Sequence, residues 1–246
     1  MSQAARLTDA ILVTGAARRV GLHLAQRLLA VGHPVIAHYR RESEDLSGLR
    51  DRGAVCLAAD LEDSQAVSAL VSAIKDRAGS LRAVIHNASA FEATSSDLDH
   101  ALAQMEQMFA IHVRAPYALN VGLADLLRAC TQPHADIIHI TDIFADNPNP
   151  TFDVYCASKA AAQNMALSFA KRLAPKVKVN VIQPGPILFQ DWHSEAVRQK
   201  VLAESLLGVE GGAEAIGLAV EALLANHFQT GAVIPVDGGR RLGQRG

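Results

Sequence analysis

A tyrosine and a lysine one helical turn apart are the residues of this sequence best suited to acid–base chemistry. Tyr155 and Lys159 lie in an alanine-rich stretch, 153–173, that favours a long helix, and residues four apart share one helical face. A lysine ammonium beside a phenol is expected to lower the phenol pKa from its usual value of about 10. Tyr155 would then exchange protons near neutral pH. The alternative is an ordinary solvated helix face.

A further acidic group precedes this helix. Asp142 follows an apolar segment, 136–141, that is typical of a buried strand. At the carboxyl end of a parallel strand, the carboxylate would face the cleft in which such folds bind ligands. Asp142 would then be a third catalytic residue beside Tyr155 and Lys159. As an alternative, Asp142 caps a helix or forms a turn.

The first predicted strand, 10–14, runs into a turn with the features of a phosphate site. Gly15 permits a tight turn, and Gly21 lets the following helix pack close to the sheet. The free N–H groups at the start of that helix, near Val20, would face a pyrophosphate. Arg19 stands where a dinucleotide-binding motif has its middle glycine. The alternative is an ordinary strand-to-helix turn.

The end of the second predicted strand indicates which dinucleotide would bind. An NAD site has an acidic residue there, whereas this sequence has Tyr39, Arg40 and Arg41. A guanidinium suits a 2′-phosphate, so we predict NADPH as the cofactor. The alternative is a solvated basic turn balanced by the acidic residues that follow it. Asp60, after the third strand, is placed to accept a hydrogen bond from an adenine amino group, or else caps a helix.

Short apolar segments alternate with helical patterns along the chain. Several of them lack polar alternation, which is typical of strands covered on both faces of a parallel sheet. Repeated strand–helix alternation implies crossovers and a doubly wound sheet. We therefore expect an α/β fold of the Rossmann type, with a seven-stranded parallel sheet in a single domain, 1–246. The expected strands are 10–14, 34–38, 54–58, 83–86, 136–141, 178–182 and 232–236, and the expected helices include 20–31, 65–77 and 153–173.

Composition and charge exclude several classes of protein. The 246 residues are 50% hydrophobic, and 23 basic against 25 acidic residues give a net charge of -2. This balance argues against binding to nucleic acid or a membrane surface, and no apolar run approaches the roughly 18 residues of a membrane span. The 10 histidines show no metal-ligand pattern, so no metal is expected. The polar segment 1–9 and three widely spaced cysteines predict a cytoplasmic protein.

These features together resemble the short-chain dehydrogenase/reductase family over nearly the whole chain. The matching elements occur in the family's order: the turn at 14–21, Asp60, Asn87-Ala88, Tyr155 with Lys159, Pro184-Gly185 and Asp237-Gly238-Gly239. The resemblance implies an oxidoreductase in which hydride passes between a nicotinamide and a substrate, the tyrosine delivers the proton and the lysine holds the ribose. By position, it implies cofactor contacts at Gly15, Arg19, Val20, Gly21, Tyr39, Arg40, Arg41, Asp60, Leu61, Asn87, Ala88, Ser89, Tyr155, Lys159, Pro184, Gly185 and Ile187.

Departures from the family pattern narrow the resemblance. Asp142 replaces the usual serine, Arg19 replaces the middle glycine, and His112 replaces a helix asparagine, which leaves open whether the asparagine-linked proton relay exists here. Asp142, Arg19 and the segment 87–91 are similar to the pteridine reductases, and further segments resemble the bacterial dihydromonapterin reductases. That resemblance implies substrate contacts at Ser89, Phe91, Asp142, Tyr155 and Phe189, with the Phe91 ring stacked on a pterin.

The expected function is therefore NADPH-dependent reduction of a dihydropterin, with Tyr155 and Asp142 delivering the proton. The expected substrate is 7,8-dihydromonapterin, which gives tetrahydromonapterin, with dihydrofolate as a second candidate. The alternatives are a carbonyl reductase of the 3-oxoacyl thioester type and a protein that senses NADPH without turnover. The loop with Phe189 and Trp192 is either a substrate lid or a hydrophobic anchor. The family resemblance implies a homotetramer formed through helices 105–130 and 153–173.

Overall fold

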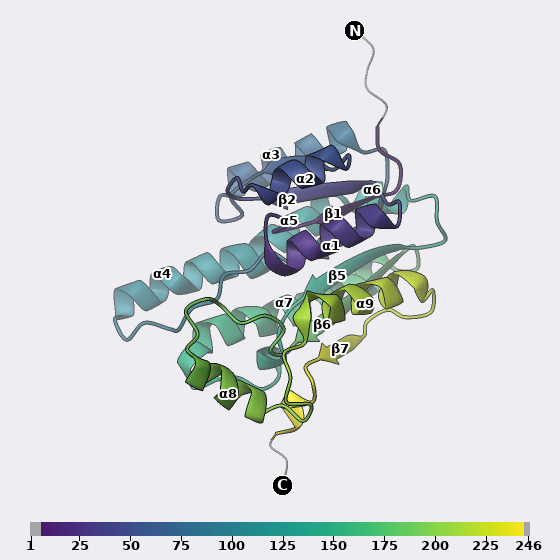
Figure 1. Ribbon diagram of the computed structural model, residues 1–246. Helices are drawn as coiled ribbons and strands as arrows, with labels where there is room; N and C mark the ends of the chain where they lie inside the picture. Colours follow the sequence, from purple (N-terminus) through teal and green to yellow (C-terminus); the bar gives the residue numbers. More distant parts are fainter. Residues whose placement is uncertain (1–5, 244–246) are drawn as a thin grey trace.

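The computed structural model describes residues 6–243 (Figure 1). Seven strands form one parallel sheet in the order β3-β2-β1-β4-β5-β6-β7, so the expected doubly wound fold of the Rossmann type is confirmed. Residues 1–5 and 244–246, and with them most of the segment 1–9, lie outside the described part. The strands are β1 (Ala10–Val13), β2 (Val35–Tyr39), β3 (Val55–Ala58), β4 (Leu81–His86), β5 (Ala135–Ile140), β6 (Val177–Pro184) and β7 (Val233–Val236).

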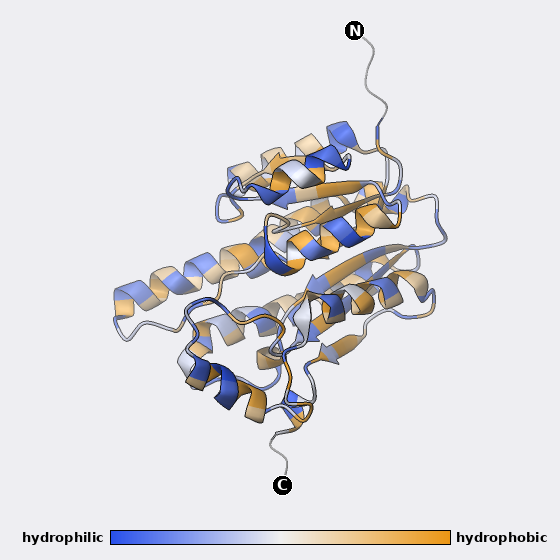
Figure 2. Cartoon of the chain, viewed as in Figure 1, coloured by the Kyte–Doolittle hydropathy of each residue, from blue (hydrophilic) through white to orange (hydrophobic). Residues whose placement is uncertain are grey.

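Helices cover both faces of the sheet, which explains why its central strands are apolar throughout. Every residue of β1 and β4 is buried, and Figure 2 shows the strands as mostly hydrophobic. One face packs against α1, α2 and α9, and the other against α3, α5 and α7. These helices are α1 (Arg19–Ala30), α2 (Asp45–Asp51), α3 (Ser64–Arg77), α5 (Ala115–Gly122), α7 (Asp153–Leu173) and α9 (Gly212–Ala225).

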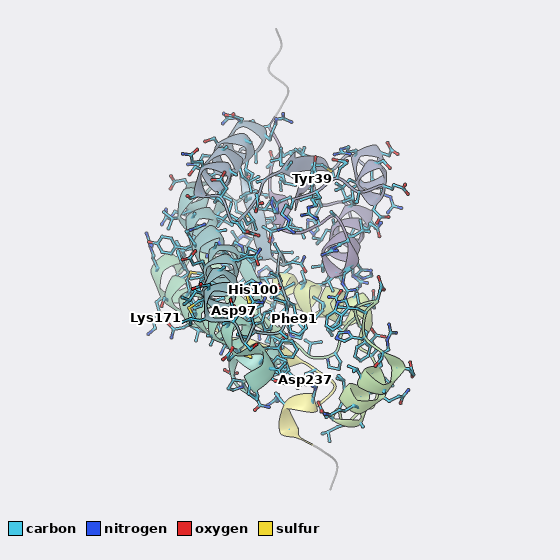
Figure 3. All side chains as sticks on the ribbon, turned by 90° about the vertical axis from the view of Figure 1, so that its left-hand side faces the viewer. Tyr39, Phe91, Asp97, His100, Lys171 and Asp237 are labelled. Atoms are coloured by element: carbon cyan, nitrogen blue, oxygen red, sulfur yellow. The ribbon has the colours of Figure 1, made fainter. Side chains whose placement is uncertain are left out.

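The chain changes its direction of travel across the sheet between β1 and β4. From β1 it moves outward through β2 to β3, and then returns to place β4 on the other side of β1. In open α/β sheets, ligands bind outside the carboxyl ends of the strands at such a point. Figure 3 looks toward this edge of the sheet, along which Tyr39, Phe91 and Asp237 are spread.

The helix expected over 105–130 is wrong as a single element. It is divided into α4 (Leu98–Phe109), a π-helical turn (Ala110–Arg114), α5 and α6 (Ala124–Arg128). The extra residue in the π-helical turn interrupts the regular helical spacing, a device that frequently occurs at functional sites. His112 lies within this turn and is buried. Within residues 6–243, none of the helices has both the length and the apolar character that crossing a membrane requires.

A buried ion cluster ties three neighbouring strands to the end of α9. The carboxylate of Asp136 on β5 has no exposed surface and lies between Arg82 of β4 and Lys178 of β6. Lys178 Nζ lies 2.9 Å from Asp136 Oδ1 and donates to the carbonyls of Leu223 and Asn226. Within the described chain, the carboxylate is the only anion bonded to the two buried cations, so both share its single negative charge.

We expect Asp136→Asn to destabilise the fold by about 3–5 kcal/mol, because it leaves two buried cations without their counter-charge. The measurement is the free energy of unfolding from chemical denaturation. Asp125→Asn is the matched control, since Asp125 pairs with Arg128 at the surface, where its side chain is 87% exposed, and it should cost little. Equal stability of the Asp136→Asn variant and the wild type would contradict this role.

Candidate active site

The turn after β1 can be built only with glycine at its two key positions. Gly15 has a φ of +70°, and a Cβ there would lie 2.9 Å from Ala88 Cα. A Cβ on Gly21 would lie 2.1 Å from the carbonyl oxygen of Gly15 and 2.5 Å from Asn87 Nδ2. The turn and the segment after β4 are therefore in direct contact.

Hydrogen bonds fix the end of β4 against this turn. Asn87 Nδ2 donates to the carbonyl oxygens of Thr14, at 2.9 Å, and Gly15, at 3.2 Å. Thr14 Oγ1 in turn accepts from the backbone N–H groups of Asn87 and Ala88. The side chain of Asn87 therefore organises the backbone on both sides of the crevice at the β1–β4 switch point.

Arg19 adopts the backbone conformation that a glycine has in this motif. Its φ of +54° lies in the left-handed region, which costs about 1–2 kcal/mol for a residue with a Cβ. The guanidinium donates to the carbonyl oxygens of Leu188, at 2.6 Å, and Phe189, at 3.2 Å. Arg19 thus joins the turn to the loop after β6. The residue before it, Arg18, makes no side-chain cap, so the start of α1 is left open for a ligand.

Basic residues gather at the end of β2. Arg40 and Arg41 are exposed, and Arg40 pairs with Glu62 at 3.0 Å. Arg50 of α2 donates to the Tyr39 hydroxyl at 3.2 Å and joins this group, although sequence reasoning missed it. Arg50 lies in the last turn of a seven-residue helix and also bonds both carboxylate oxygens of Glu42, contacts that no sequence pattern signals.

Asp60 does not cap α3, so one of its two expected roles is wrong. The cap is Asp63, which accepts from the N–H of Gln65. Asp60 is exposed, and its Oδ1 accepts from the N–H of Glu62 at 3.0 Å, which folds the loop after β3. The next residue, Leu61, is buried in the core and anchors this loop.

The loop after β6 closes the other end of the crevice. A Cβ on Gly185 would lie 2.7 Å from Asp237 Cα, so the Pro184-Gly185 and Asp237-Gly238-Gly239 motifs meet. Ile187 is buried against the apolar cluster of α1 and α9, and Val20 packs at the edge of the same cluster. The structure thus places the expected cofactor residues from β1, β2, β4 and β6 along one edge of the sheet.

Tyr155, Asp142 and Lys159 form one group, in which Tyr155 and Lys159 are buried and Asp142 is half-buried. The Tyr155 hydroxyl donates to Asp142 Oδ2 at 2.9 Å. Asp142 Oδ1 accepts from the N–H of Phe144, which fixes the carboxylate. Lys159 Nζ donates to the carbonyl oxygen of Ile140 at 3.2 Å and lies 5.5 Å from the centre of the Tyr155 ring. The structure therefore brings together the three side chains that the sequence singled out.

The expected lowering of the tyrosine pKa is wrong for this arrangement. Burial, and then the charge and hydrogen bond of Asp142, raise the pKa of Tyr155 well above 10. Burial also raises the pKa of Asp142 and lowers that of Lys159 to about 8. The physical reason is that the carboxylate is bonded to the phenol oxygen, whereas the ammonium is bonded to a backbone carbonyl. At neutral pH, Tyr155 therefore keeps its proton.

An aromatic group borders the phenol. The Phe91 ring stacks on Phe152, with 4.6 Å between ring centres, and meets the Tyr155 ring edge-on at 4.8 Å. Phe144 lies behind Phe152. Sequence reasoning found Phe91 and missed the other two phenylalanines, which flank an irregular, proline-containing loop without a readable pattern. Phe91 faces the viewer in Figure 3.

The other expected substrate residues have different surroundings. Ser89 is exposed and its hydroxyl lies 2.9 Å from His112 Nε2. The Phe189 ring packs against His193 and Arg198, and these contacts do not join it to the group around Phe91. Trp192 rests on His193 and is 65% exposed. Both aromatic residues lie in the loop that precedes α8 (Glu195–Ala203).

The glycine turn after β1 and the tyrosine–lysine pair on α7 both lie within a segment that matches the sequence model of a protein family. The sequence model described as short chain dehydrogenase matches residues 9–200. The chain belongs to the short-chain dehydrogenase family. Membership confirms the expected class of oxidoreductase.

Relatives within this family carry more specific names. Dihydromonapterin reductase from Klebsiella pneumoniae is 42% identical over 232 residues, which covers 94% of this chain and 96% of that protein. Dihydromonapterin reductase from Escherichia coli (strain SMS-3-5) is 41% identical, again over 94% of this chain and 96% of that protein. A solved structure, FolM alternative dihydrofolate reductase 1 from Brucella suis in complex with NADP, superposes with a TM-score of 0.87 at 29% identity and covers 97% of both chains.

We expect Asp142→Asn to lower the pKa of the Tyr155 phenol, because removal of the carboxylate charge favours the phenolate. The chain has only three tyrosines, so alkaline ultraviolet difference titration resolves the change, and Tyr155→Phe assigns it. Asp99→Asn, at an exposed carboxylate of α4, is the matched control and should leave the titration unchanged. An Asp142→Asn titration identical to that of the wild type would show that the carboxylate does not hold the phenol proton.

Proposed function

We propose that this protein is an NADPH-dependent reductase of dihydropterins, which converts 7,8-dihydromonapterin to tetrahydromonapterin and accepts dihydrofolate as a second substrate. The observation that carries the proposal is the buried Tyr155–Asp142 hydrogen bond beside the Phe91 ring. A phenol that keeps its proton at neutral pH has a proton that it can donate to a ring nitrogen of the substrate. The names of the relatives agree with this chemistry.

The residues of the crevice fit NADPH. Gly15 has no side chain, so the backbone of the turn packs directly against Ala88. The backbone N–H groups at the start of α1 receive no side-chain cap from Arg18, and they suit a pyrophosphate. At the far end, the exposed guanidinium groups of Arg40 and Arg41 suit a 2′-phosphate. When bound, the nicotinamide supplies the hydride. The NADP complex of the Brucella suis relative supports the same cofactor.

The proton comes from the side chains of this chain. Reduction of the C6–N5 double bond of a dihydropterin requires a hydride at C6 and a proton at N5, and we assign the proton to the Tyr155 hydroxyl. The phenolate left behind lies against the Asp142 carboxylate, so a positive charge must compensate. Lys159 supplies it, because its pKa of about 8 keeps the ammonium charged at neutral pH. Asp142, whose pKa burial raises, is placed to exchange a proton with the phenol oxygen.

The aromatic group would hold a flat bicyclic substrate. Phe91 is fixed by Phe152 on one side and by the Tyr155 edge, so its position relative to the phenol is set before a ligand arrives. Stacking on an aromatic face suits a pterin ring and orients it for reaction. Phe189 lies in the loop before α8, apart from the Phe91 group, and would contact the substrate from that loop.

The exposed side chains, the cysteines and the net charge bear on the oligomeric state and the cellular location of the protein. We propose one domain and a homotetramer formed through α4, α5 and α7, because large apolar side chains lie exposed on α4 and α5. They include Leu98, Leu102, Met105, Tyr117 and Val121, which are 41–70% exposed. A cytoplasmic location, without nucleic-acid or membrane partners, agrees with the free thiols of Cys56, Cys130 and Cys156 and with the balanced charge.

The purified protein should oxidise NADPH at least about tenfold faster with dihydromonapterin than with acetoacetyl thioesters or simple ketones. NADPH should also be preferred to NADH by at least about tenfold, because a 2′-phosphate gains charge-assisted bonds from the arginines. The measurement is kcat/KM for each substrate by the loss of NADPH absorbance. The reverse ranking of substrates would support the carbonyl reductase alternative and end the pterin assignment.

Tyr155→Phe should reduce turnover by about 10²–10⁴-fold, because it removes the proton donor. The affinity for NADPH, measured by fluorescence titration, should change little, since the hydroxyl donates to Asp142 and the other expected cofactor residues are unaltered. Wild-type protein that binds NADPH but turns over no pterin, carbonyl or quinone would support the NADPH-sensing alternative instead.

A further inference from the structure

His112 joins the segment after β4 to the first turns of α7. Its Nε2 lies 2.9 Å from Ser89 Oγ and accepts from the N–H of Ala90 at 3.2 Å. On the other side of the ring, Nδ1 lies 2.8 Å from Ser158 Oγ. The histidine is only 3% exposed, so these bonds decide its chemical state.

The partners fix which nitrogen of His112 carries the proton. A backbone N–H can only donate, so Nε2 must accept from Ala90 and carries no hydrogen. The single ring proton is therefore on Nδ1, which donates to Ser158 Oγ. Ser158 is consistent with this assignment, because its own proton goes to the carbonyl oxygen of Tyr155 at 2.7 Å. Burial and the charge of Lys159 lower the pKa of His112 well below 6.5, which keeps the ring neutral.

This tautomer determines how Ser89 meets a ligand. The hydroxyl has one proton, and its acceptors are His112 Nε2 at 2.9 Å, the Ala90 carbonyl oxygen at 3.2 Å and the phenol oxygen of Tyr155. Because all three belong to buried or partly buried residues, the proton points into the protein. Because Ser89 is exposed, its oxygen lone pairs are left for the crevice.

We propose that His112 is a positioning residue, which holds the Ser89 hydroxyl as a hydrogen-bond acceptor for an N–H group of the substrate. This role rests on the proposed function only for the identity of the substrate. A bicyclic dihydropterin offers ring N–H and amino donors, whereas a 3-oxoacyl group offers an acceptor at its reacting carbon. The contact with Ala90 also fixes the segment that leads to Phe91.

The tautomer is tested without any substrate. In a two-bond ¹H–¹⁵N spectrum of the ¹⁵N-labelled protein, the ring of His112 should show a protonated Nδ1 and a bare Nε2. The signals should not titrate between about pH 6 and about pH 8, where an unperturbed histidine does. Loss of the signals in His112→Asn assigns them. A proton on Nε2, or a titration in this range, would overturn the proposal.

Two variants separate the acceptor side of His112 from its donor side. A glutamine oxygen reaches the place of Nε2 and keeps the acceptor for Ser89, whereas asparagine reaches only the place of Nδ1 and keeps the bond to Ser158. His112→Asn and Ser89→Ala should each raise KM for dihydromonapterin about tenfold, with kcat within about twofold. His112→Gln should stay within about threefold of the wild type. His227→Asn, at an exposed histidine of the turn before β7, is the matched control.

The double variant His112→Asn with Ser89→Ala should be no worse than Ser89→Ala alone, because His112 acts through that hydroxyl. Independent effects, which would multiply to about a hundredfold, would overturn the proposal. A fall in kcat with KM unchanged, or equal damage in His112→Gln and His112→Asn, would overturn it as well. If no dihydropterin is turned over, the proposed function fails, while the tautomer in the spectrum still decides the role of His112.

Discussion

The hydrogen bond between the Tyr155 phenol and the Asp142 carboxylate governs the chemistry of this crevice. It joins a half-buried side chain from the loop after β5 to a buried one from the first turn of α7. In that environment a carboxylate and a phenolate cannot easily be charged together, so the pair holds a proton at neutral pH. Lys159 lies close enough to offset the charge when that proton leaves, while its own bond goes to the backbone of β5. Strand β5, the loop after it and helix α7 hold these three side chains at fixed distances from one another.

The sequence predicted the frame of this arrangement well because the frame depends on local patterns. All seven strands were found, since fully buried parallel strands form short uninterrupted apolar runs. Tyr155 and Lys159 are four residues apart, and this spacing places both side chains on one face of a helix. The glycine turn was predictable for the same reason, because the steric need for glycine at Gly15 and Gly21 arises within one short segment of the sequence. Motifs distant in sequence, such as Gly185 and Asp237, required the family resemblance.

What the sequence could not supply depends on contacts between distant segments. The π-helical turn that buries His112 has no signal in the apolar periodicity, so the helix over 105–130 was expected to be continuous. The pKa of Tyr155 moves upward because the bond to Asp142 outweighs the lysine, and spacing alone cannot say which neighbour reaches the phenol oxygen. Phe152 completes the aromatic group from a loop with no regular pattern.

Arg19 shows that a residue other than glycine can adopt the left-handed backbone conformation in this strand-to-helix turn. Its φ of +54° reproduces the bend that a glycine would give, while its side chain spans to the carbonyls of Leu188 and Phe189. A search keyed to the glycine letters of a dinucleotide-binding signature would pass over this chain, although a comparison of dihedral angles would find it. Searches for such enzymes therefore gain sensitivity when they compare backbone torsion angles in structures at this position rather than amino-acid identity.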